Sequence, residues 1–477
     1  MSLRVYNTLT RRKEDFTPIH GNRVYMFVCG PTTYDLSHLG HARTYIAYDI
    51  IARYLRYKGY TLFYVMNITD VDDKIIKRAE SLGRDPLELA REYERYFYED
   101  MAALGIESVN LFARASEHIP EIIDLVKVLI EKGYAYETET GVYYDITKFE
   151  DLGALSHQNP EELKKHRIEP DPTKRNPQDF ALWKKRGPEE LGWDSPWGRG
   201  RPGWHIEDTA ITMCYFGPQY DIHGGAIELI FPHHEAEIAQ AEAATGRKPL
   251  VKYWVHTGVL KVEGKKMSKS LGNFVTIREA LKKYEPEVLR FFFASSHYRS
   301  TIDFSEKKLE QAKRSLQTLR NALNSIRSLR PKPELEEDDR ELEEKMLRCR
   351  ENFIKAMDDD FNSPYALKAL FEMANEVNRF VESHETINRE TLKKVLETFR
   401  ELGGIFNILQ KEEKTVDSKI VSDLVELIIE LRQKFRKAKD WQTSDMIRSR
   451  LKSLGIILED KADRTTWRIE SQSKKES

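Results

Sequence analysis

One cysteine and two histidines stand close together near the start of the chain, in the stretch FVCGPTTYDLSHLGHARTY, residues 27–45. Cys29 ends a short apolar run, and His38 and His41 enclose a Leu-Gly pair just before a segment with helical periodicity. Thiols and imidazoles bind transition metals, and imidazoles also donate hydrogen bonds to phosphates. Both histidines would face one side of a turn that enters a helix, whose N-terminus favours anions. Taken alone, these residues are more typical of a buried cysteine and two hydrogen-bonded turn histidines.

A second group of residues with chemical potential is the lysine-rich segment GVLKVEGKKMSKSLGN, residues 258–273. Lys265, Lys266 and Lys269 lie there among glycines and serines, after an apolar, strand-like run. Ammonium groups in such a loop can neutralise phosphates. Most runs of charge, however, are solvated surface.

The elements that must position these groups alternate between strands and helices. Residues 23–30 and 61–70 are rich in Val, Phe and Tyr, and residues 41–60 between them have apolar positions at helical spacing. Strand, helix and strand in succession predict a crossover unit and a parallel sheet. Helices are predicted at 85–104 and 118–132, and strands again at ITMCYF, DIHGG, IELIF and YWVHTGVL, within residues 211–260. We therefore expect an α/β, Rossmann-like domain that is interrupted by an insertion.

The same patterns predict the organisation of the whole chain. Periodicity is lost between residues 134 and 200, where Pro, Gly, Trp and charged residues accumulate, and it is purely helical after residue 306. An acidic stretch, residues 331–345, is predicted to be an exposed connection between helices. The expected divisions are a first Rossmann half (1–133), an insertion (134–200), a second Rossmann half (201–260), the lysine-rich loop with the residues after it (261–305), a helical bundle (306–410) and a small α+β module (415–477).

Composition narrows the class of protein further. The 477 residues include only three cysteines, at 29, 214 and 349, too few for a disulfide framework and suited to a reducing cytoplasm. No apolar run approaches the ~18 residues of a membrane span, and the N-terminus has no apolar signal core. A net charge of −2 argues against a wholly basic nucleic-acid binder but permits a local basic face. We expect a cytoplasmic protein with no membrane partner.

The HxGH turn and the KMSKS loop, in this order within one α/β region, resemble the two signatures of class I aminoacyl-tRNA synthetases. Other segments narrow the resemblance to the cysteinyl-tRNA synthetase family, and it extends to the tail segments DMIRSRLKSLGIILED and TTWRIE. The segments that carry it are CGPTTYDLSHLGHAR, NITDVDDKII, GWHIE, DIHGG, FPHHEAEIAQ, KMSKSLGN and DDDFNSPYAL. The resemblance implies an enzyme that activates L-cysteine with ATP and Mg²⁺, releases pyrophosphate and transfers cysteine to the 3′ end of tRNA(Cys).

The chemistry of that reaction explains the residue types in the two signatures. When the cysteine carboxylate attacks the α-phosphate, negative charge builds on the transferring phosphoryl and on pyrophosphate, so catalysis is mostly positioning and electrostatic stabilisation. The resemblance implies that His38 and His41 donate hydrogen bonds to the phosphates and that Lys266 and Lys269 neutralise pyrophosphate. The lysines lie on a loop because it must open for ATP and close over the transition state.

The resemblance also implies a zinc ion that binds the substrate thiolate. Its ligands would be Cys29, Asp208, His233 and Glu237, although this chain has Asp208 where the family has a cysteine. Zinc accepts carboxylate oxygen at ~2.0–2.2 Å, and the formal ligand charge is unchanged. Two alternatives stay open: Cys214 could be the fourth ligand, or the site could hold little metal. Taken alone, His233 and Glu237 would be an ordinary surface pair at i and i+4 of a helix.

Zinc would explain how cysteine is distinguished from the near-isosteric serine. A pocket that excludes bulk discriminates only ~10–200-fold per methylene-sized difference, whereas only a thiol deprotonates readily on the metal. Selection at binding requires no editing domain, and the insertion is short for one. By the same resemblance, the cysteine pocket is lined by Thr69, Trp204 and His223, which could equally be a strand-end cap, a core aromatic and a turn histidine. ATP would be bound by Gly40, Glu228, Gly258, Val259, Lys266 and Lys269, with Glu228 standing where the family usually has Asp.

The C-terminal third resembles the tRNA-binding part of the family. Residues 306–409 would contact the anticodon stem, and the module at 415–477 would bind the anticodon. Residues 432–452 hold eight basic and two acidic residues, with aromatics among them that can stack on unpaired bases. The predicted contacts are Arg432, Arg436, Trp441 and Arg448, and we expect a monomer. Two other functions stay open: a tRNA-independent ligase that joins cysteine to a small amine, and a non-catalytic RNA-binding homologue.

Overall fold

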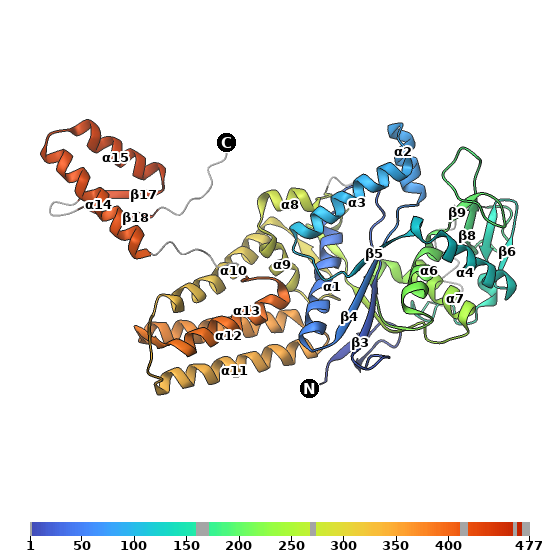
Figure 1. The fold of residues 1–477 in the computed structure, drawn as a ribbon, viewed down its shortest axis with the longest axis horizontal. Helices are drawn as coiled ribbons and strands as arrows, with labels where there is room; N and C mark the ends of the chain where they lie inside the picture. Colours follow the sequence, from blue (N-terminus) through green and yellow to red (C-terminus); the bar gives the residue numbers. More distant parts are fainter. Residues whose placement is uncertain (1, 159–170, 268–272, 411–417, 461–464, 470–477) are drawn as a thin grey trace. The chain divides into compact units, whose positions relative to one another are not determined.

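The computed structural model describes residues 2–158, 171–267, 273–410, 418–460 and 465–469. It contains two compact units, Met1–Gln410 and Lys411–Ser477 (Figure 1). The first is built around a parallel sheet in the order β11-β10-β3-β4-β5. Its strands are β3 (Arg23–Val28), β4 (Thr61–Ile68), β5 (Leu111–Arg114), β10 (Tyr220–Ala226) and β11 (Val251–Thr257). The predicted α/β, Rossmann-like parallel sheet is confirmed.

Helices cover both faces of this sheet. In Figure 1, α1 (Leu39–Tyr57) and α3 (Pro86–Ala103) lie on one side, and α4 (Ile119–Glu131), α6 (Trp204–Phe216) and α7 (Glu235–Thr245) lie on the other. Strand β3 shows why, because its side chains alternate between two apolar cores. Met26 and Val28 pack in the core that contains α1, whereas Phe27 and Cys29 pack in the core that contains α6 and α7.

The junction between β3 and β10 fixes the place of a binding site. The chain leaves β3 through α1 toward β4, while β10, from the second half of the domain, pairs with the other edge of β3. Ligands of such open sheets bind beyond the carboxyl ends of the strands at this switch point. Here the Cys29 amide donates to Gly224 O at 3.0 Å, and His223 pairs in register with Phe27. Residues near 29 and 223, far apart in sequence, therefore meet.

The insertion forms an antiparallel sheet of β6 (Ala135–Glu137), β7 (Gly141–Tyr144), β8 (Phe180–Lys185) and β9 (Gly200–Pro202). Two strand predictions beside it are wrong. ITMCYF forms the end of helix α6, and an apolar run of only six residues cannot be distinguished from a buried strand by periodicity alone. IELIF forms a 3₁₀ turn, η3 (Ile227–Leu229), and the start of a π-turn segment, η4 (Ile230–His234), where Pro232 lacks the amide that a sheet needs.

The remaining elements of the first unit surround this core. They are β1 (Arg4–Asn7), β2 (Arg12–Asp15), α2 (Asp73–Leu82), η1 (Ala115–Glu117), η2 (Ile146–Lys148), β12 (Leu260–Val262), β13 (Lys265–Lys266), α8 (Ile277–Lys283), α9 (Pro286–Ala294) and β14 (Ile302–Phe304). Strands β12, β13 and β14 form a small sheet that follows the domain's last parallel strand in sequence. This small sheet carries the start of the lysine-rich segment.

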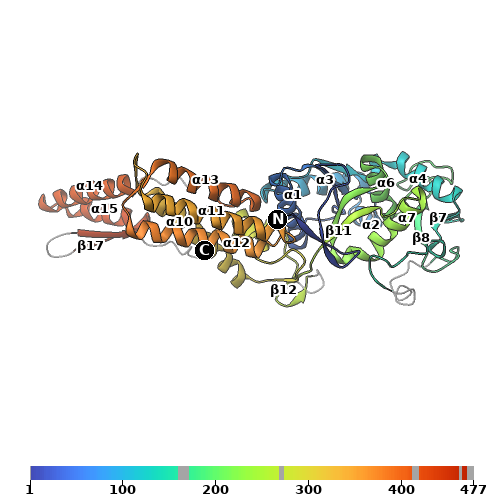
Figure 2. The ribbon, with the colours of Figure 1, turned by 90° about the horizontal axis from the view of Figure 1, so that it is seen from below.

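A helical bundle completes the first unit. It consists of α10 (Glu306–Arg327), α11 (Glu337–Asp358), α12 (Ser363–Ser383) and α13 (Arg389–Phe406), with a short pair of strands, β15 (Arg330–Lys332) and β16 (Thr386–Asn388) (Figure 2). The prediction that 331–345 is only a connection is wrong, because α11 begins at Glu337. Glu336 and Asp339 form a capping box, and acidic side chains in a first turn favour the positive end of a helix.

The second unit contains α14 (Ser418–Lys437), α15 (Trp441–Ser453), β17 (Ile456–Asp460) and β18 (Thr465–Ile469). The two strands are antiparallel. Val425, Ile429, Leu451 and Leu458 form its small core. In the described parts of both units, no helix has the length and apolarity needed to cross a bilayer.

Candidate active site and metal centre

A cavity of about 540 Å³ lies beyond the carboxyl ends of β3, β4, β10 and β11. It brings together most of the predicted site residues, from widely separated parts of the chain. One wall, the thiol wall, contains Cys29, Thr69, Trp204, Asp208 and His233. A second group of lining residues, the phosphate wall, contains His38, Gly40, His41, Glu228, Gly258 and Val259.

The four predicted metal ligands converge behind the thiol wall. One ligand atom each from Cys29, Asp208, His233 and Glu237 lies within 4.8 Å of all the others, and the four residues are buried. His233 Nε2 is 3.0 Å from Asp208 Oδ2 and 3.1 Å from Glu237 Oε1. The four residues come from the end of β3, from α6, from η4 and from α7, respectively.

The electrostatics of this cluster fit a bound cation. Both Glu237 carboxylate oxygens are buried, and although ring nitrogens of His233 and His223 lie 3.1 and 3.4 Å from them, neither oxygen receives a hydrogen bond of regular geometry from the described residues. Burial and the neighbouring Asp208 raise the pKa of Glu237 well above its usual value, and burial together with Asp208 and Glu237 raises the pKa of the Cys29 thiol. Burial of carboxylates without a counter-charge destabilises a fold, whereas a divalent cation bound between them offsets this cost and favours the deprotonated ligands. One sulfur, one imidazole and two carboxylates form a donor set that zinc accepts.

A second group of metal-binding type shares two members with the first. Cys29, His223, His234 and Glu237 also offer ligand atoms within 4.8 Å of one another, and all four residues are buried. Cys29 Sγ lies 3.2 Å from His234 Nε2 and 3.5 Å from His223 Nε2. His223, predicted to line the cysteine pocket, thus lies behind Cys29 and outside the cavity lining, and His234 was not predicted. Cys214 is exposed on α6 and belongs to neither group.

Two residues that the sequence did not single out orient the predicted ligands. Asn67, near the end of β4, donates from Nδ2 to Asp208 Oδ1 at 2.6 Å and to Thr69 Oγ1 at 3.2 Å. Its Oδ1 accepts from the Gly30 amide at 2.5 Å. His205 Nδ1 lies 2.9 Å from His233 Nδ1. Asn67 and His205 stand inside the segments NITDVDDKII and GWHIE, which is the signal that could have identified them.

Trp204 forms the rim of the thiol wall. Its ring stacks on His233 with centroids 4.3 Å apart and an interplanar angle of 21°. The side chain is 39% exposed, so its other face is accessible. Trp204 is therefore placed to pack against a small substrate in the cavity.

The phosphate wall is organised by the first turn of α1. His38 is the N-cap, and its Nδ1 accepts from the amides of Gly40 at 3.0 Å and His41 at 3.4 Å. His41 Nδ1 in turn accepts from the His38 amide at 3.4 Å, and the two rings stack with centroids 3.9 Å apart. In a neutral imidazole whose Nδ1 accepts, the proton is on Nε2. Burial and the adjacent His38 lower the pKa of His41, which keeps that ring neutral.

The glycines of this wall are required by close contacts. A Cβ on Gly40 would lie 2.8 Å from the His38 ring, and a Cβ on Gly258 would lie 2.4 Å from Ser300 O. The backbone of Lys266 pairs with Lys261 in the β12–β13 sheet, and the adjacent Met267 lines the cavity. The side chain of Lys266, and all of Lys269, lie outside the described residues.

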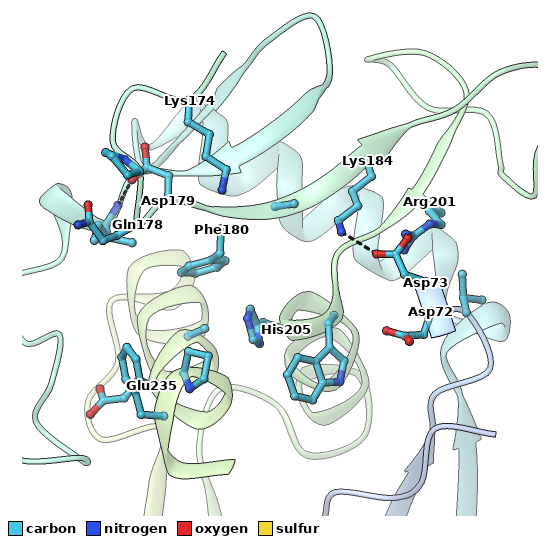
Figure 3. Close-up of a pocket in the computed structure, with 18 of the residues that line it drawn as sticks. Asp72, Asp73, Lys174, Gln178, Asp179, Phe180, Lys184, Arg201, His205 and Glu235 are labelled. Atoms are coloured by element: carbon cyan, nitrogen blue, oxygen red, sulfur yellow. Dashed lines mark hydrogen bonds and ion pairs between the residues drawn. The ribbon is translucent and has the colours of Figure 1, made fainter. Parts of the chain in front are cut away.

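A second cavity, of about 700 Å³, shares part of its lining with the first, including Trp204, and Figure 3 shows side chains that line it. The insertion contributes Phe180 and Lys184 to it, and the catalytic domain contributes Asp73 and His205. Lys184 Nζ lies 3.0 Å from Asp73 Oδ2, and Arg201 also pairs with Asp73. Burial alone raises the pKa of Asp73, but Arg201 and Lys184 lower it to about 2. Aromatic rings and cations thus lie next to the entrance of the first cavity.

The predicted tRNA contacts in the second unit differ in exposure. Arg436 and Arg448 are exposed, and Trp441 is 57% exposed. Arg448 also donates to Leu458 O at 3.5 Å. Arg432, on α14, is only 2% exposed, and it offers little surface to a phosphate.

Comparison with known proteins covers nearly the whole chain. The family described as "tRNA synthetases class I (C) catalytic domain" matches residues 15–314, a DALR domain matches 352–410, and "Cysteinyl-tRNA ligase anticodon binding domain" matches 422–468. A cysteine–tRNA ligase of Thermococcus onnurineus is 52% identical over 98% of this chain and 99% of its own length. Those of Pyrococcus horikoshii and Heliobacterium modesticaldum are 50% and 47% identical over 98% of this chain and 99% and 100% of theirs.

Among solved structures, the fold is similar to that of Mycobacterium tuberculosis methionyl-tRNA synthetase in complex with methionyl-adenylate. The TM-score is 0.62 at 17% identity, over 84% of this chain and 96% of that one. This likeness concerns the fold alone. The domain matches and the identity across full-length relatives go further: the chain belongs to the cysteine–tRNA ligases, within the class I aminoacyl-tRNA synthetases.

Proposed function

We propose that the cavity between the thiol wall and the phosphate wall is where this cysteine–tRNA ligase forms cysteinyl-adenylate. The observation that supports this most strongly is the convergence of Cys29, Asp208, His233 and Glu237 beside the cavity that the HxGH histidines also line. Cysteine enters on one side and ATP on the other, so that the carboxylate and the α-phosphate meet between the walls. Holding the two reactants in this way supplies much of the rate enhancement.

On the phosphate wall, His38 and His41 donate from Nε2 to the phosphates of ATP. Their Nδ1 atoms accept backbone amides, so the donors are preset before ATP arrives. Glu228 binds the ribose hydroxyls, and Gly40, Gly258 and Val259 allow the nucleotide to approach the backbone. Lys266 and Lys269 would neutralise the pyrophosphate that leaves, and Mg²⁺ would supply further positive charge there. No side chain acts as a nucleophile.

On the thiol wall, Cys29, Asp208, His233 and Glu237 would hold zinc. When bound, zinc supplies a Lewis acid that favours the thiolate of cysteine over the hydroxyl of serine. Asn67 and His205 fix the orientation of Asp208 and His233 through their hydrogen bonds. Thr69 and Trp204 enclose the side chain of the substrate, and His223 supports Cys29 from behind.

For the second step, the transfer to tRNA, we propose that the 3′ end enters along the second cavity, where Phe180 and Lys184 offer an aromatic ring and a cation (Figure 3). In this proposal residues 1–133 and 201–260 carry out catalysis, and residues 134–200 contact the acceptor end. Residues 261–305 provide loop closure. Residues 306–410 contact the anticodon stem, and residues 415–477 bind the anticodon. Arg436, Trp441 and Arg448 are the proposed anticodon contacts, and Arg432 stabilises the module. We propose that the protein is cytoplasmic and that it is a monomer. Analytical sedimentation would test the monomeric state.

The metal assignment is tested by the Asp208→Ala variant, with Cys214→Ala as the matched control on the same helix. Metal content by mass spectrometry and cysteine-dependent ATP–pyrophosphate exchange are measured for both. We expect Asp208→Ala to lower zinc content and to raise the KM for cysteine, and Cys214→Ala to change neither. Full zinc occupancy in Asp208→Ala that disappears in the double variant would transfer the ligand role to Cys214.

The role of the C-terminal module is tested by deleting residues 415–477, which form most of a separate compact unit. Exchange, which needs no tRNA, is expected to stay near the wild-type rate, whereas charging of tRNA(Cys) falls sharply. Unchanged charging would count against anticodon binding by the module. The match of residues 422–468 to an anticodon-binding domain supports the first outcome.

A further inference from the structure

The turn between α11 and α12 of the helical bundle contains a buried carboxylate, Asp360, that the proposed mechanism does not use. Asp360 is fully buried. Its φ is +65° and that of Phe361 is +52°, both in the left-handed region that non-glycine residues rarely adopt. Strain of this kind persists where the surrounding contacts specify the conformation. The question is which contacts do so here.

Asp360 binds two segments that are distant from it in sequence, β1 and residues 295–301. Oδ1 accepts from the Tyr6 amide in β1 at 2.9 Å and from the Tyr298 hydroxyl at 2.7 Å. Oδ2 accepts from Arg299 Nε at 2.8 Å and Nη2 at 2.7 Å. The segment 295–301, which contains Tyr298 and Arg299, is thus tied to the bundle by charge-assisted hydrogen bonds.

The same segment supports the phosphate wall with its backbone. The Gly258 amide donates to Tyr298 O at 2.8 Å, and the amide of Ile302, the residue that follows the segment, donates to Val259 O at 3.0 Å. The carbonyl oxygens of residues 299 and 300 lie so close to Gly258 that no side chain fits there. Any shift of the segment therefore displaces Gly258 and Val259.

Segment 295–301 also holds the helix that carries the two histidines. Arg43, in the first turns of α1, is buried, and its Nη2 donates to the carbonyls of His297 at 2.8 Å, Tyr298 at 2.7 Å and Ser300 at 3.3 Å. Arg43 lies two residues after the second histidine of the HxGH turn. One segment thus contacts both halves of the phosphate wall, and Asp360 is the carboxylate that anchors it to the bundle.

We propose that Asp360 is a positioning residue for ATP in cysteine activation, acting through segment 295–301 on Gly258, Val259 and the start of α1. The inference rests on the proposed ATP position at the phosphate wall. Asp360 touches neither substrate, so its loss misplaces the nucleotide and leaves the thiol wall intact. A displacement of reacting groups by a fraction of an ångström is enough to lower the rate.

The test compares Asp360→Asn with Asp359→Asn. The first change keeps one oxygen acceptor but turns an amide donor toward Arg299 or Tyr298, whereas Asp359 is half exposed and pairs with surface Lys13 at 2.7 Å. Exchange is measured on enzyme whose active fraction is known from adenylate titration. We expect Asp360→Asn to raise the KM for ATP about 5–10-fold and to lower kcat, with the KM for cysteine and the zinc content unchanged. Asp359→Asn should behave as wild type.

Tyr298→Phe guards against simple misfolding of the Asp360→Asn variant. It removes one hydroxyl donor to Asp360 and keeps the ring, which contacts Phe361 with centroids 6.3 Å apart. We expect a smaller rise in the KM for ATP, about 2–3-fold, with Tm nearly unchanged. A lower active fraction with both KM values unchanged in the two variants would overturn the inference, as would equal rises in both KM values.

A parallel His41→Asn variant separates this inference from the proposed ATP position. If His41→Asn lowers kcat for exchange by ~10²–10³-fold while Asp360→Asn leaves the KM for ATP unchanged, only the role of Asp360 fails. If His41→Asn exchanges normally, the ATP position itself is wrong.

Discussion

The thiol wall and the phosphate wall of the active-site cavity are built in opposite ways. The thiol wall assembles Cys29, Asp208, His233 and Glu237 from four elements, and all of these side chains are buried. Half of the phosphate wall is one contiguous turn, residues 38–41, whose histidines are partly exposed and whose donors are set by its own backbone. The other half comes from residues 228 and 258–259. The thiol wall depends wholly on tertiary packing, whereas the histidine turn of the phosphate wall forms locally and only its placement beside residues 228 and 258–259 depends on packing.

This difference matches what each wall must do. Cysteine has to be distinguished from serine by the chemistry of one atom, which requires a dry cluster with fixed ligands. ATP is large and charged, and pyrophosphate must leave in every cycle, so its wall has to stay accessible. Variants on the two walls should therefore fail in different ways, one in metal content and amino-acid affinity and the other in the rate of phosphoryl chemistry.

The largest effect is expected for Cys29→Ser. A hydroxyl does not replace the thiolate as a zinc ligand, and Asp208 and Glu237 then lie buried next to a weaker site. We expect loss of most of the zinc and a fall in kcat/KM for cysteine on the order of 10³-fold, more than the ~10–100-fold typical of outer partners of a metal. Mass spectrometry and exchange kinetics measure this. Retention of zinc at full occupancy would remove Cys29 from the ligand set.

The second effect, on the other wall, is expected for His41→Asn. The change removes one preset donor to the phosphates, which typically costs ~10²–10³-fold in kcat. Zinc content and the equilibrium binding of cysteine should be as in wild type, since His41 is not among the residues of the ligand cluster. Pre-steady-state measurement of adenylate formation reports the chemical step directly. A variant that loses zinc together with activity would contradict the division of the two walls.

The contrast between the walls also explains what could be predicted from the sequence. The parallel sheet and the turn at 38–41 follow from local periodicity and from adjacent residues, so they were accessible. The thiol wall needed the family resemblance, because no local pattern connects residue 29 with residue 237. His234, Asn67 and His205 were missed, since their importance arises only when β3, β4, α6 and η4 come together. A related limit explains ITMCYF, because a six-residue apolar run at the end of helix α6 has the pattern of a short strand until its packing is known.

A third, smaller effect is expected for Gly40→Ala. The new Cβ would lie 2.8 Å from the His38 ring, so the ring must shift away from the position in which Nδ1 caps α1. We expect kcat for exchange to fall about 10-fold, with the KM for cysteine unchanged. Gly21→Ala is the matched control, at an exposed turn with open space around it. An alanine there is strained because φ is +66°, but its side chain does not contact the site. It should lower Tm and leave kcat alone, and equal kinetic effects in both variants would contradict the geometric argument.

The smallest effect concerns a charge beside the second cavity, outside both walls. Partial burial raises the pKa of Asp73, but Arg201 and Lys184 outweigh it and lower the pKa to about 2. A carboxylate whose folded pKa lies below its unfolded value of ~3.8 stabilises the protein above that value, and the contribution is lost as pH falls toward 2. Because Asp73 is 39% exposed, solvent screening limits its contribution to the free energy of unfolding to under about 1 kcal/mol.

Asp73→Asn should therefore lower Tm by about 1–2 °C at pH 7 and by less at pH 3, whereas exchange kinetics at pH 7 stay unchanged. Thermal unfolding followed by circular dichroism at the two pH values measures the difference against wild type. Substitution of a residue in either wall should change zinc content or exchange. Because Asp73 lies outside both walls, Asp73→Asn should change only Tm. If the Tm difference between Asp73→Asn and wild type were larger at pH 3 than at pH 7, the predicted pH dependence would be wrong, and Asp73 would not be the anion that stabilises the fold.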